Sequence, residues 1–331
     1  MKKHLIMLLL LAALLLLSAC GGSPSADPEY TAPIVVGFSQ VGAESDWRNA
    51  NTRSMQTALS AANGFRLILD DAQQKKERQI TALRNFIHQG VDYIVLAPTT
   101  EDGWDTVLYE ARAAGIPVII IDRMIYGEGQ IGLDENGEPL FTCWIGSDFR
   151  TQGDKAVRWM EDTFGDEPLH IVHLQGNYGS SAQIGRTASL DAGLAANPQW
   201  TLVARDSGDF TQAKAQEIIG TLLARGVSFN VIFAENDNMA YGAIEALKAA
   251  GLTPGVDVHI ISFDANQRAL EMVLTGEISC NVECNPLHGP RVLEVIMQLE
   301  RGETPPRYTY VEEGVFTIDG LTQDIIDSRG Y

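Results

Sequence analysis

Residues 34–50 read IVVGFSQVGAESDWRNA, a stretch in which an apolar run is followed by a polar segment. Its apolar first part predicts a buried β-strand, and its second part predicts a helix that begins near Asp46. A nucleotide-binding α/β protein would place a glycine-rich phosphate loop between the two elements. This chain instead carries Ser39, Glu44, Trp47 and Arg48 there. An acid, a large aromatic ring and a guanidinium therefore stand where a phosphate loop would carry glycine.

Strand-like apolar runs alternate with helical patterns along the chain. The runs lie at residues 34–38, 66–70, 93–98 and 116–122, and then at 169–176, 201–207, 230–236 and 258–264. Each run is nearly continuously apolar, as expected of a parallel sheet that helices cover on both faces. Between the two sets, the polar residues 124–140 interrupt the periodicity, and we assign no role to 127–138. The predicted fold class is therefore α/β, with two doubly wound, Rossmann-like lobes.

The end of the chain does not fit either lobe alone. A further strand is predicted at residues 277–283, followed by a helix at about 286–301 and a β-rich tail. This order suggests that the chain crosses between the lobes more than once.

The N-terminus predicts export. Two lysines precede a short apolar run that ends in Leu-Ser-Ala-Cys, and the run is too short for a comfortable membrane span. The ending resembles the bacterial lipoprotein signal, in which Cys20 is lipidated; a plain secretory signal is the alternative. We expect a lipoprotein signal peptide at residues 1–20 and a flexible tether, rich in Gly, Ser and Pro, at 21–30. The folded part would then be extracytoplasmic and lipid-anchored to the cell membrane.

Composition excludes several classes of partner. The 331 residues carry a formal net charge of −19, so the surface repels the phosphates of nucleic acids and of anionic lipids. A glycine-rich segment at 174–185 lacks both phosphate-loop spacings. His170 and His173 point to opposite faces of a strand, and Cys280 and Cys284 lack a second ligand pair for zinc. We expect no metal site and no cofactor, and we expect buried thiols at the cysteines after Cys20, with one disulfide as the open alternative.

The ends of the predicted strands indicate the ligand. In open α/β sheets, ligands bind beyond the carboxyl ends of the strands. These ends carry Asp122 and Arg123 in the first half, and Phe210, Asn236 and Asp264 in the second. Acids, amides and guanidinium groups can each bond two adjacent hydroxyls, while aromatic rings cover apolar C–H faces. The pattern suits a neutral polyol.

Several motifs together resemble the sugar-binding proteins of bacterial ABC importers, of the ribose- and galactose-binding type. They are GFSQVGAESDWR, IPVIIIDR, SGDFTQAKAQE, ENDNMAYGAIEALKAAGL and ISFD, and the likeness covers about residues 35–290. The first motif resembles most closely the galactofuranose-binding group. The resemblance implies two lobes joined by a three-crossing hinge: residues 31–146 with 284–312, and residues 147–283 with 313–331. It also implies a monomer whose partners are a monosaccharide and a membrane permease.

The same resemblance implies the residues that contact the sugar. They are Ser39, Glu44, Trp47, Arg48, Asp122, Arg123, Arg186, Phe210, Asn236, Asp264 and Glu283. Trp47 would stack on the ring, and Glu44 and Arg48 would bond its hydroxyls. Galactofuranose is the first choice of sugar; galactose, arabinose, ribose and other aldoses stay open.

Three other functions compete with import. A receptor for a membrane sensor kinase would use the same sugar-loaded form, so the sequence does not separate it from import. A transcription regulator would need a DNA-binding helix-turn-helix before residue 31, where an export signal stands. A glycoside-acting enzyme could pair Asp122, Asp264 and Glu283 as carboxylates. Because an arginine beside an acid lowers its pKa, the sequence disfavours a general acid and predicts that the protein is not an enzyme.

Overall fold

The computed structural model describes residues 32–126 and 132–331. The chain divides into two units, Met1–Pro33 and Ile34–Tyr331, and all the helices and strands named below belong to the second. The predicted signal peptide, the tether and the lipidation residue Cys20 lie outside the described residues. Within those residues, none of the helices combines the length and apolar character that crossing a bilayer requires.

The described strands form two six-stranded sheets. The first, in the order β11-β5-β4-β3-β1-β2, contains β1 Ile34–Gln40, β2 Phe65–Asp71, β3 Tyr93–Leu96, β4 Val118–Ile121, β5 Cys143–Gly146 and β11 Tyr308–Tyr310. The second, in the order β12-β10-β9-β8-β6-β7, contains β6 Leu169–Gln175, β7 Trp200–Ser207, β8 Val231–Ala234, β9 His259–Asp264, β10 Cys280–Glu283 and β12 Val315–Phe316. Neighbouring strands of these sheets run parallel, except that β10 and β12 are antiparallel. The two-lobe α/β prediction is confirmed.

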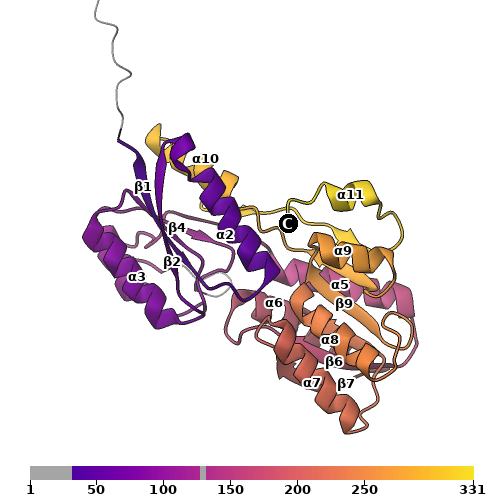
Figure 1. Cartoon of the computed structure of the whole chain (residues 1–331). Coiled ribbons are helices and arrows are strands. Elements are labelled where there is room, and N and C mark those ends of the chain that lie inside the picture. The colour runs from indigo at the N-terminus through magenta and orange to yellow at the C-terminus, as the bar shows by residue number, and fades with distance from the viewer. Residues whose placement is uncertain (1–31, 127–131) are drawn as a thin grey trace, which may run out of the picture. The chain divides into compact units, whose positions relative to one another are not determined.

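Helices cover both faces of each sheet (Figure 1). Those that follow the strands of the first sheet are α2 Asp46–Ala58, η1 Ala61–Asn63, α3 Lys76–Gln89 and α4 Asp105–Ala113. Those of the second are α5 Phe149–Phe164, α6 Ser181–Ala196, α7 Gln212–Ala224, α8 Asp237–Ala249 and α9 Gln267–Leu274, with α11 Gln323–Asp327 in the tail. The remaining helix, α10 Gly289–Glu300, comes late in the chain but lies beside α2, where the Gly289 amide donates to Ser54.

The order of these elements produces three crossings between the sheets. The chain leaves the first sheet after β5, returns to it after β10 through α10 and β11, and crosses again to reach β12. Both sheets reverse their strand order at one point, between β1 and β3 and between β6 and β8. Ligands bind at such switch points, beyond the carboxyl ends of the strands.

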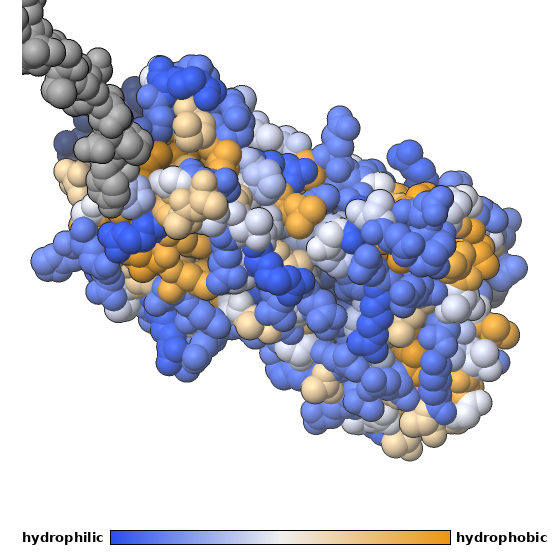
Figure 2. Space-filling view, turned by 45° about the horizontal axis from the view of Figure 1, so that its top comes forward, coloured by the Kyte–Doolittle hydropathy of each residue, from blue (hydrophilic) through white to orange (hydrophobic). Residues whose placement is uncertain are grey.

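The core alternates across each sheet with the two-residue period of a strand. In β3, Val95 packs toward α2 and α10, whereas Ile94 and Leu96 pack toward α3 and α4. In β8, Ile232 packs toward α7 and α8, and Phe233 toward α5. Each sheet is therefore sandwiched, which explains the continuously apolar runs. Hydrophilic side chains predominate on the outer face seen in Figure 2, as the net charge of −19 leads one to expect.

Some elements were not predicted from the sequence. Strand β5 and helix α5 follow the polar stretch at 124–140, where the periodicity is interrupted, and α9 was also missed. The tail contains a helix, α11, besides its short strands. Strand β5 directly follows the polar stretch, which hides its short run. Helix α5 has one buried face between the cap residues Asp148 and Gly165, a pattern from which it could have been predicted.

Helix packing in the second lobe depends on a glycine. A Cβ at Gly242 in α8 would lie 2.1 Å from the Gln212 carbonyl oxygen at the start of α7. Backbone atoms cannot move aside cheaply, so we expect Gly242→Ala to lower the free energy of unfolding by about 2 kcal/mol. Gly220 in α7 is the control, since its Cβ would meet nothing within 4 Å. Gly220→Ala should stabilise by about 0.5–1 kcal/mol, through helix propensity alone. Urea denaturation of both variants measures the difference, and equal effects would contradict this account.

Candidate functional site

Loops from both sheets line one cavity, whose atom-free space, open solvent at its mouth included, is about 310 Å³. Nine of the eleven residues predicted to bind a ligand line it: Glu44, Trp47, Arg48, Asp122, Arg123, Arg186, Phe210, Asn236 and Asp264. The sequence analysis missed four further residues, Ser45, Phe149, Ala182 and Cys284. Phe149 was missed together with α5, and Ser45 could have been found as the residue that caps α2, where its side chain accepts from the Arg48 amide.

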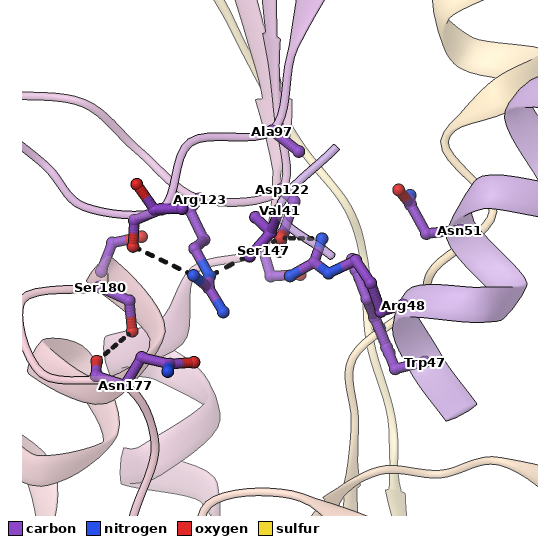
Figure 3. A network of polar contacts seen from close by, with 12 residues as sticks. Val41, Trp47, Arg48, Asn51, Ala97, Asp122, Arg123, Ser147, Asn177 and Ser180 are labelled. Carbon is purple, nitrogen blue, oxygen red and sulfur yellow. Dashed lines mark hydrogen bonds and ion pairs between the residues drawn. The ribbon is translucent and has the colours of Figure 1, made fainter. Parts of the chain in front are cut away.

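Asp122 is the centre of the first-lobe side of the cavity. Arg48 and Arg123 approach it from opposite sides (Figure 3). Arg48 Nη1 donates to Oδ2 at 2.8 Å, and Arg123 Nε forms an ion pair with the same oxygen at 3.9 Å. Arg48 also donates to Glu44 Oε1 at 3.1 Å. Although burial opposes it, the charges of Asp122 and Glu44 raise the pKa of Arg48. The first loop is thus held in place by its own ion pairs.

Two groups on this side keep hydrogen-bonding capacity. Glu44 Oε2 is buried and has no partner among the residues that the structure describes. Arg123 is 3 % exposed, yet its one hydrogen bond within the described residues goes from Nη1 to the Thr99 carbonyl at 3.1 Å. Burial and then the charge of Arg48 lower the pKa of Arg123 to about 10. A buried acceptor and a buried donor therefore border the cavity without full partners, which is costly unless a polar ligand completes them.

Arg186 of α6 provides the second-lobe guanidinium. Its Nε and Nη2 donate to Gln152 Oε1 at 3.0 and 2.7 Å, and its Nη1 donates to the Glu235 carbonyl. Its Nη2 also lies 4.0 Å from Asp264 Oδ1. From its place in the sequence this residue has the usual interpretation of a solvated arginine, and only the resemblance indicated a ligand role. The structure buries it at 2 % exposure, at the wall of the cavity.

Glycines at strand ends make room for the site. A Cβ at Gly146 would lie 2.3 Å from the Asp122 carbonyl oxygen, and a Cβ at Gly176 would lie 1.9 Å from Phe210 Cζ. Asp122, Phe210 and Asp264 have positive φ angles of 63°, 60° and 112°. Such backbone is uncommon for residues with a side chain and clusters at functional sites. Both lobes thus accept local strain at the strand ends that face the cavity.

Aromatic rings form apolar walls. Trp47, Phe149 and Phe210 line the cavity, and each has a guanidinium over its ring, at 4.6 Å for Arg48 on Trp47. Trp47 Nε1 donates to the Cys284 carbonyl at 2.7 Å, which fixes the indole between α2 and the second crossing. Asn236 caps α8 through Oδ1 and donates from Nδ2 to the Phe210 carbonyl. The sequence allowed Asn236 both a helix-cap role and a ligand role, and the structure shows the helix cap.

The structure does not bring Ser39 and Glu283 into the cavity. Ser39 is fully buried within β1, and its Oγ has no partner among the described residues. Glu283 ends β10 and faces the C-terminal tail, where it accepts from Arg329 at 2.6 Å and from the Gly314 amide at 3.0 Å.

Arginines beside the acids were expected to lower each carboxyl pKa. The expectation holds for Glu283, where burial is outweighed by hydrogen bonds from Arg329 and Gly314 that lower the pKa, but it is wrong for Asp264. Burial and then the neighbouring Asp237 instead raise the pKa of Asp264 well above its usual range, and Arg186 only partly opposes them. Burial likewise raises the pKa of Asp237 to about 7, against three hydrogen-bond donors. At Asp264, the proximity of Arg186 is therefore no argument against a general acid.

The remaining reactive groups are the cysteine thiols and the side chains of the types that bind metals. Cys143, Cys280 and Cys284 are buried and free, and burial raises the pKa of each thiol. Among the described residues, no group of His, Cys, Asp and Glu side chains could hold a metal ion.

A buried histidine supports the second crossing. His288 is fully buried and its Nδ1 accepts from Asn51 Nδ2 at 2.9 Å when the ring is neutral. Burial lowers the pKa of His288 to about 4, with Asp122 partly opposing. In the unfolded chain the histidine pKa is near 6.5. Between about pH 6.5 and pH 4 the unfolded chain therefore binds a proton at His288 that the folded protein does not bind. Stability from this group is complete above that window and is lost as the pH falls through it.

We expect His288→Gln, whose amide oxygen can accept from Asn51, to remove this pH dependence. The difference in unfolding free energy between wild type and variant should shift by about 3 kcal/mol from pH 7 to pH 4, because one pKa unit corresponds to about 1.4 kcal/mol. The exposed His88 is the control, and His88→Gln should leave the wild-type profile unchanged. A parallel profile for His288→Gln, measured by denaturant titration at each pH, would contradict the account.

Residues 36–301 match the profile of the periplasmic binding protein domain. Among curated proteins, the galactofuranose-binding protein YtfQ of Escherichia coli (strain K12) is 33 % identical over 298 residues, which cover 89 % of this chain and 91 % of that protein.

Two solved structures are also similar. One, from Mycobacterium smegmatis in complex with β-D-fucofuranose, has 37 % identity and a TM-score of 0.80, covering 86 % of this chain and 91 % of that one. The other is the binding component of the arabinose ABC transporter of Shewanella sp. ANA-3, bound to L-arabinofuranose. It has 34 % identity and a TM-score of 0.79, covering 90 % and 99 % of the two chains.

Proposed function

The chain belongs to the periplasmic binding protein domain family, and from this premise we propose that it captures one monosaccharide in its furanose form and delivers it to an ABC permease. Its relatives are sugar-binding proteins rather than enzymes. The finer proposal is that the sugar is galactofuranose or a related aldofuranose. It extends to an extracytoplasmic lipoprotein, anchored through Cys20 and acting as a monomer without cofactor.

The observation that carries the proposal is the pair of incompletely bonded groups at the cavity, Glu44 Oε2 and the Arg123 guanidinium. A sugar hydroxyl both donates and accepts, so a polyol can satisfy an acid and a guanidinium at once. The cavity walls hold three guanidinium and three carboxyl groups, Arg48, Arg123 and Arg186 with Glu44, Asp122 and Asp264. Arg48 is already paired with Glu44 and Asp122, which supports a ligand that binds through hydroxyl groups over an anion such as a phosphate.

The relatives narrow the sugar. The relatives described above are named for galactofuranose or were solved with fucofuranose and arabinofuranose. All of these are five-membered rings, which supports a furanose here.

The cavity is enclosed by contacts between the two lobes. On one rim the Asp46 amide donates to Asn238 Oδ1 at 3.0 Å. On the other, Asn177 Nδ2 donates to Gln74 Oε1 at 2.8 Å, and the Met124 amide to Ser181 Oγ at 2.9 Å. In the proposed mechanism the sugar contacts both lobes and so favours this closed form, which the permease distinguishes from the open one. No bond is made or broken.

Calorimetric titration with two matched cyclic polyols tests the ring form. 1,4-Anhydro-D-galactitol is locked as a five-membered ring and 1,5-anhydro-D-galactitol as a six-membered ring, and both lack the anomeric hydroxyl. We expect the first to bind at least tenfold more tightly, and D-galactose to bind without being consumed. The reverse preference would overturn the furanose assignment; consumption of sugar would revive a glycoside-acting enzyme. If none of these compounds, nor L-arabinose, D-ribose or D-fructose, gave a detectable heat of binding, the proposal of sugar capture would be overturned.

Arg123 offers a test of the site itself. We expect Arg123→Met to weaken sugar binding by about 100-fold, because hydrogen bonds from a charged donor to the ligand are lost. The fold should not suffer, since the buried guanidinium has a single hydrogen bond within the described residues and its pKa is lowered to about 10. Arg53→Met removes the same charge at an exposed position of α2 and is the control. Wild-type affinity in Arg123→Met would remove this residue from the site.

A further inference from the structure

The three chain segments that cross between the sheets meet at one carboxylate, that of Glu313. Glu313 lies in the third crossing, between β11 and β12. Its Oε1 accepts from Ser147 Oγ, in the first crossing, at 2.6 Å and from the Asn285 amide, in the second, at 2.8 Å. Lys155 of α5 also donates to the Glu313 carbonyl at 2.6 Å. One oxygen atom thus holds all three crossings together.

The other oxygen of the same carboxylate leads to the cavity. Glu313 Oε2 accepts from Gln152 Nε2 at 2.5 Å. Gln152 Oε1 in turn accepts from Arg186 Nε and Nη2, at 3.0 and 2.7 Å. Gln152 and Arg186 are 1 % and 2 % exposed, so water does not compete for these bonds. A continuous hydrogen-bonded chain therefore runs from the half-buried Glu313 at the hinge through one buried amide to a guanidinium at the cavity wall.

The direction of each bond in this chain is fixed by the carboxylate. An ionised carboxylate only accepts, and its three described side-chain and amide partners all donate. The Gln152 amide must therefore turn its nitrogen toward Glu313 and its oxygen toward Arg186. That oxygen holds two N–H groups of the guanidinium, and Glu235 holds a third, so the remaining two of five are directed elsewhere.

The other acid at the hinge differs. Glu283 bonds Arg329, Gly314 and Asn285, and none of these residues lines the cavity. Glu313 is thus the hinge carboxylate with a hydrogen-bonded route to the ligand site within the described residues.

We propose that Glu313 is a positioning residue for ligand binding: it sets the mutual position of the three crossings and, through Gln152, orients Arg186 toward the bound molecule. The inference rests on the proposed function of the cavity as a sugar site. Burial raises the pKa of Glu313. Hydrogen bonds from Ser147, Gln152 and the Asn285 amide oppose this shift, because they stabilise the ionised carboxylate.

Substituting Glu313→Gln keeps the size of the side chain and removes the second acceptor oxygen. The new amide nitrogen must face either Gln152 Nε2 or the Asn285 amide, and both of these groups are donors. If Gln152 turns in response, its nitrogen faces the Arg186 guanidinium. We expect affinity for D-galactose to fall by about tenfold or more, the range for a lost hydrogen bond to a charged group. Glu312→Gln, at the exposed neighbour, is the matched control and should bind as wild type does.

A swap of the two side chains distinguishes positioning from a merely structural role. In Gln152→Glu alone, two carboxylates face each other, and affinity should fall. In the double variant Gln152→Glu with Glu313→Gln, the new carboxylate at position 152 accepts from Arg186 and from the new amide at position 313. The oxygen of that amide still accepts from Ser147 and Asn285. We expect this variant to regain D-galactose affinity to within about threefold of wild type.

The outcomes separate the two proposals. If the wild-type protein binds D-galactose but Glu313→Gln binds it equally well, Glu313 is not a positioning residue and the sugar site stands. If both single variants weaken binding and the swap regains nothing, the directed route through Gln152 is overturned. If the wild-type protein binds none of the sugars in the titration panel, the proposed function fails and this inference fails with it.

Discussion

Six ionisable side chains share one small buried cavity, and the surrounding structure follows from the need to satisfy them. Burying a charge without a partner costs several kcal/mol or more, about as much as the whole stability of many domains. Each arginine of the site is therefore held by an acid, an amide or a backbone carbonyl: Arg48 by Asp122, Arg123 by the Thr99 carbonyl, and Arg186 by Gln152. These bonds leave hydrogen-bonding capacity free, chiefly at Glu44 and Arg123, and a ligand can use it.

Much of this arrangement could be predicted from the sequence, for a physical reason. A strand that is covered on both faces must be apolar throughout, so the buried strands of both sheets stand out as continuous runs such as VIII in β4 and VIFA in β8. Parallel strands carry their functional groups at their carboxyl ends, so Asp122, Phe210, Asn236 and Asp264 could be identified from position alone. Strand β5 was missed because its short run follows the polar stretch at 124–140. Helix α5, with Phe149, was missed although its amphipathic pattern lies between two cap residues, Asp148 and Gly165, that could have identified it.

What the sequence could not provide is contact between residues far apart in the chain. The raised pKa of Asp264 depends on Asp237, which belongs to the neighbouring helix α8, and on burial that no local pattern reveals. Family resemblance suggested Glu283 as the hinge residue of the site, but strand β10 directs it toward the C-terminal tail and Arg329. Glu313 lies in the tail itself, where the sequence offered only a short β-rich pattern. Its importance depends on three crossings that meet only in the folded chain.

The contacts between the lobes contribute only modestly to the stability of the closed form. The rims are joined by a few neutral hydrogen bonds, among them Asp46 with Asn238, Gln74 with Asn177 and Glu101 with Gly179. A neutral hydrogen bond adds about 1 kcal/mol net, because the open form would bond the same groups to water. Such rims alone would leave the closed form only modestly favoured, while the unsatisfied groups at Glu44 and Arg123 make closure around an empty cavity costly. On the proposed function, the hydroxyls of a bound sugar form hydrogen bonds with Glu44 and Arg123. The cost of burying these two groups then becomes a gain in the free energy of closure. The residues that recognise the ligand would then also be those that make closure depend on it.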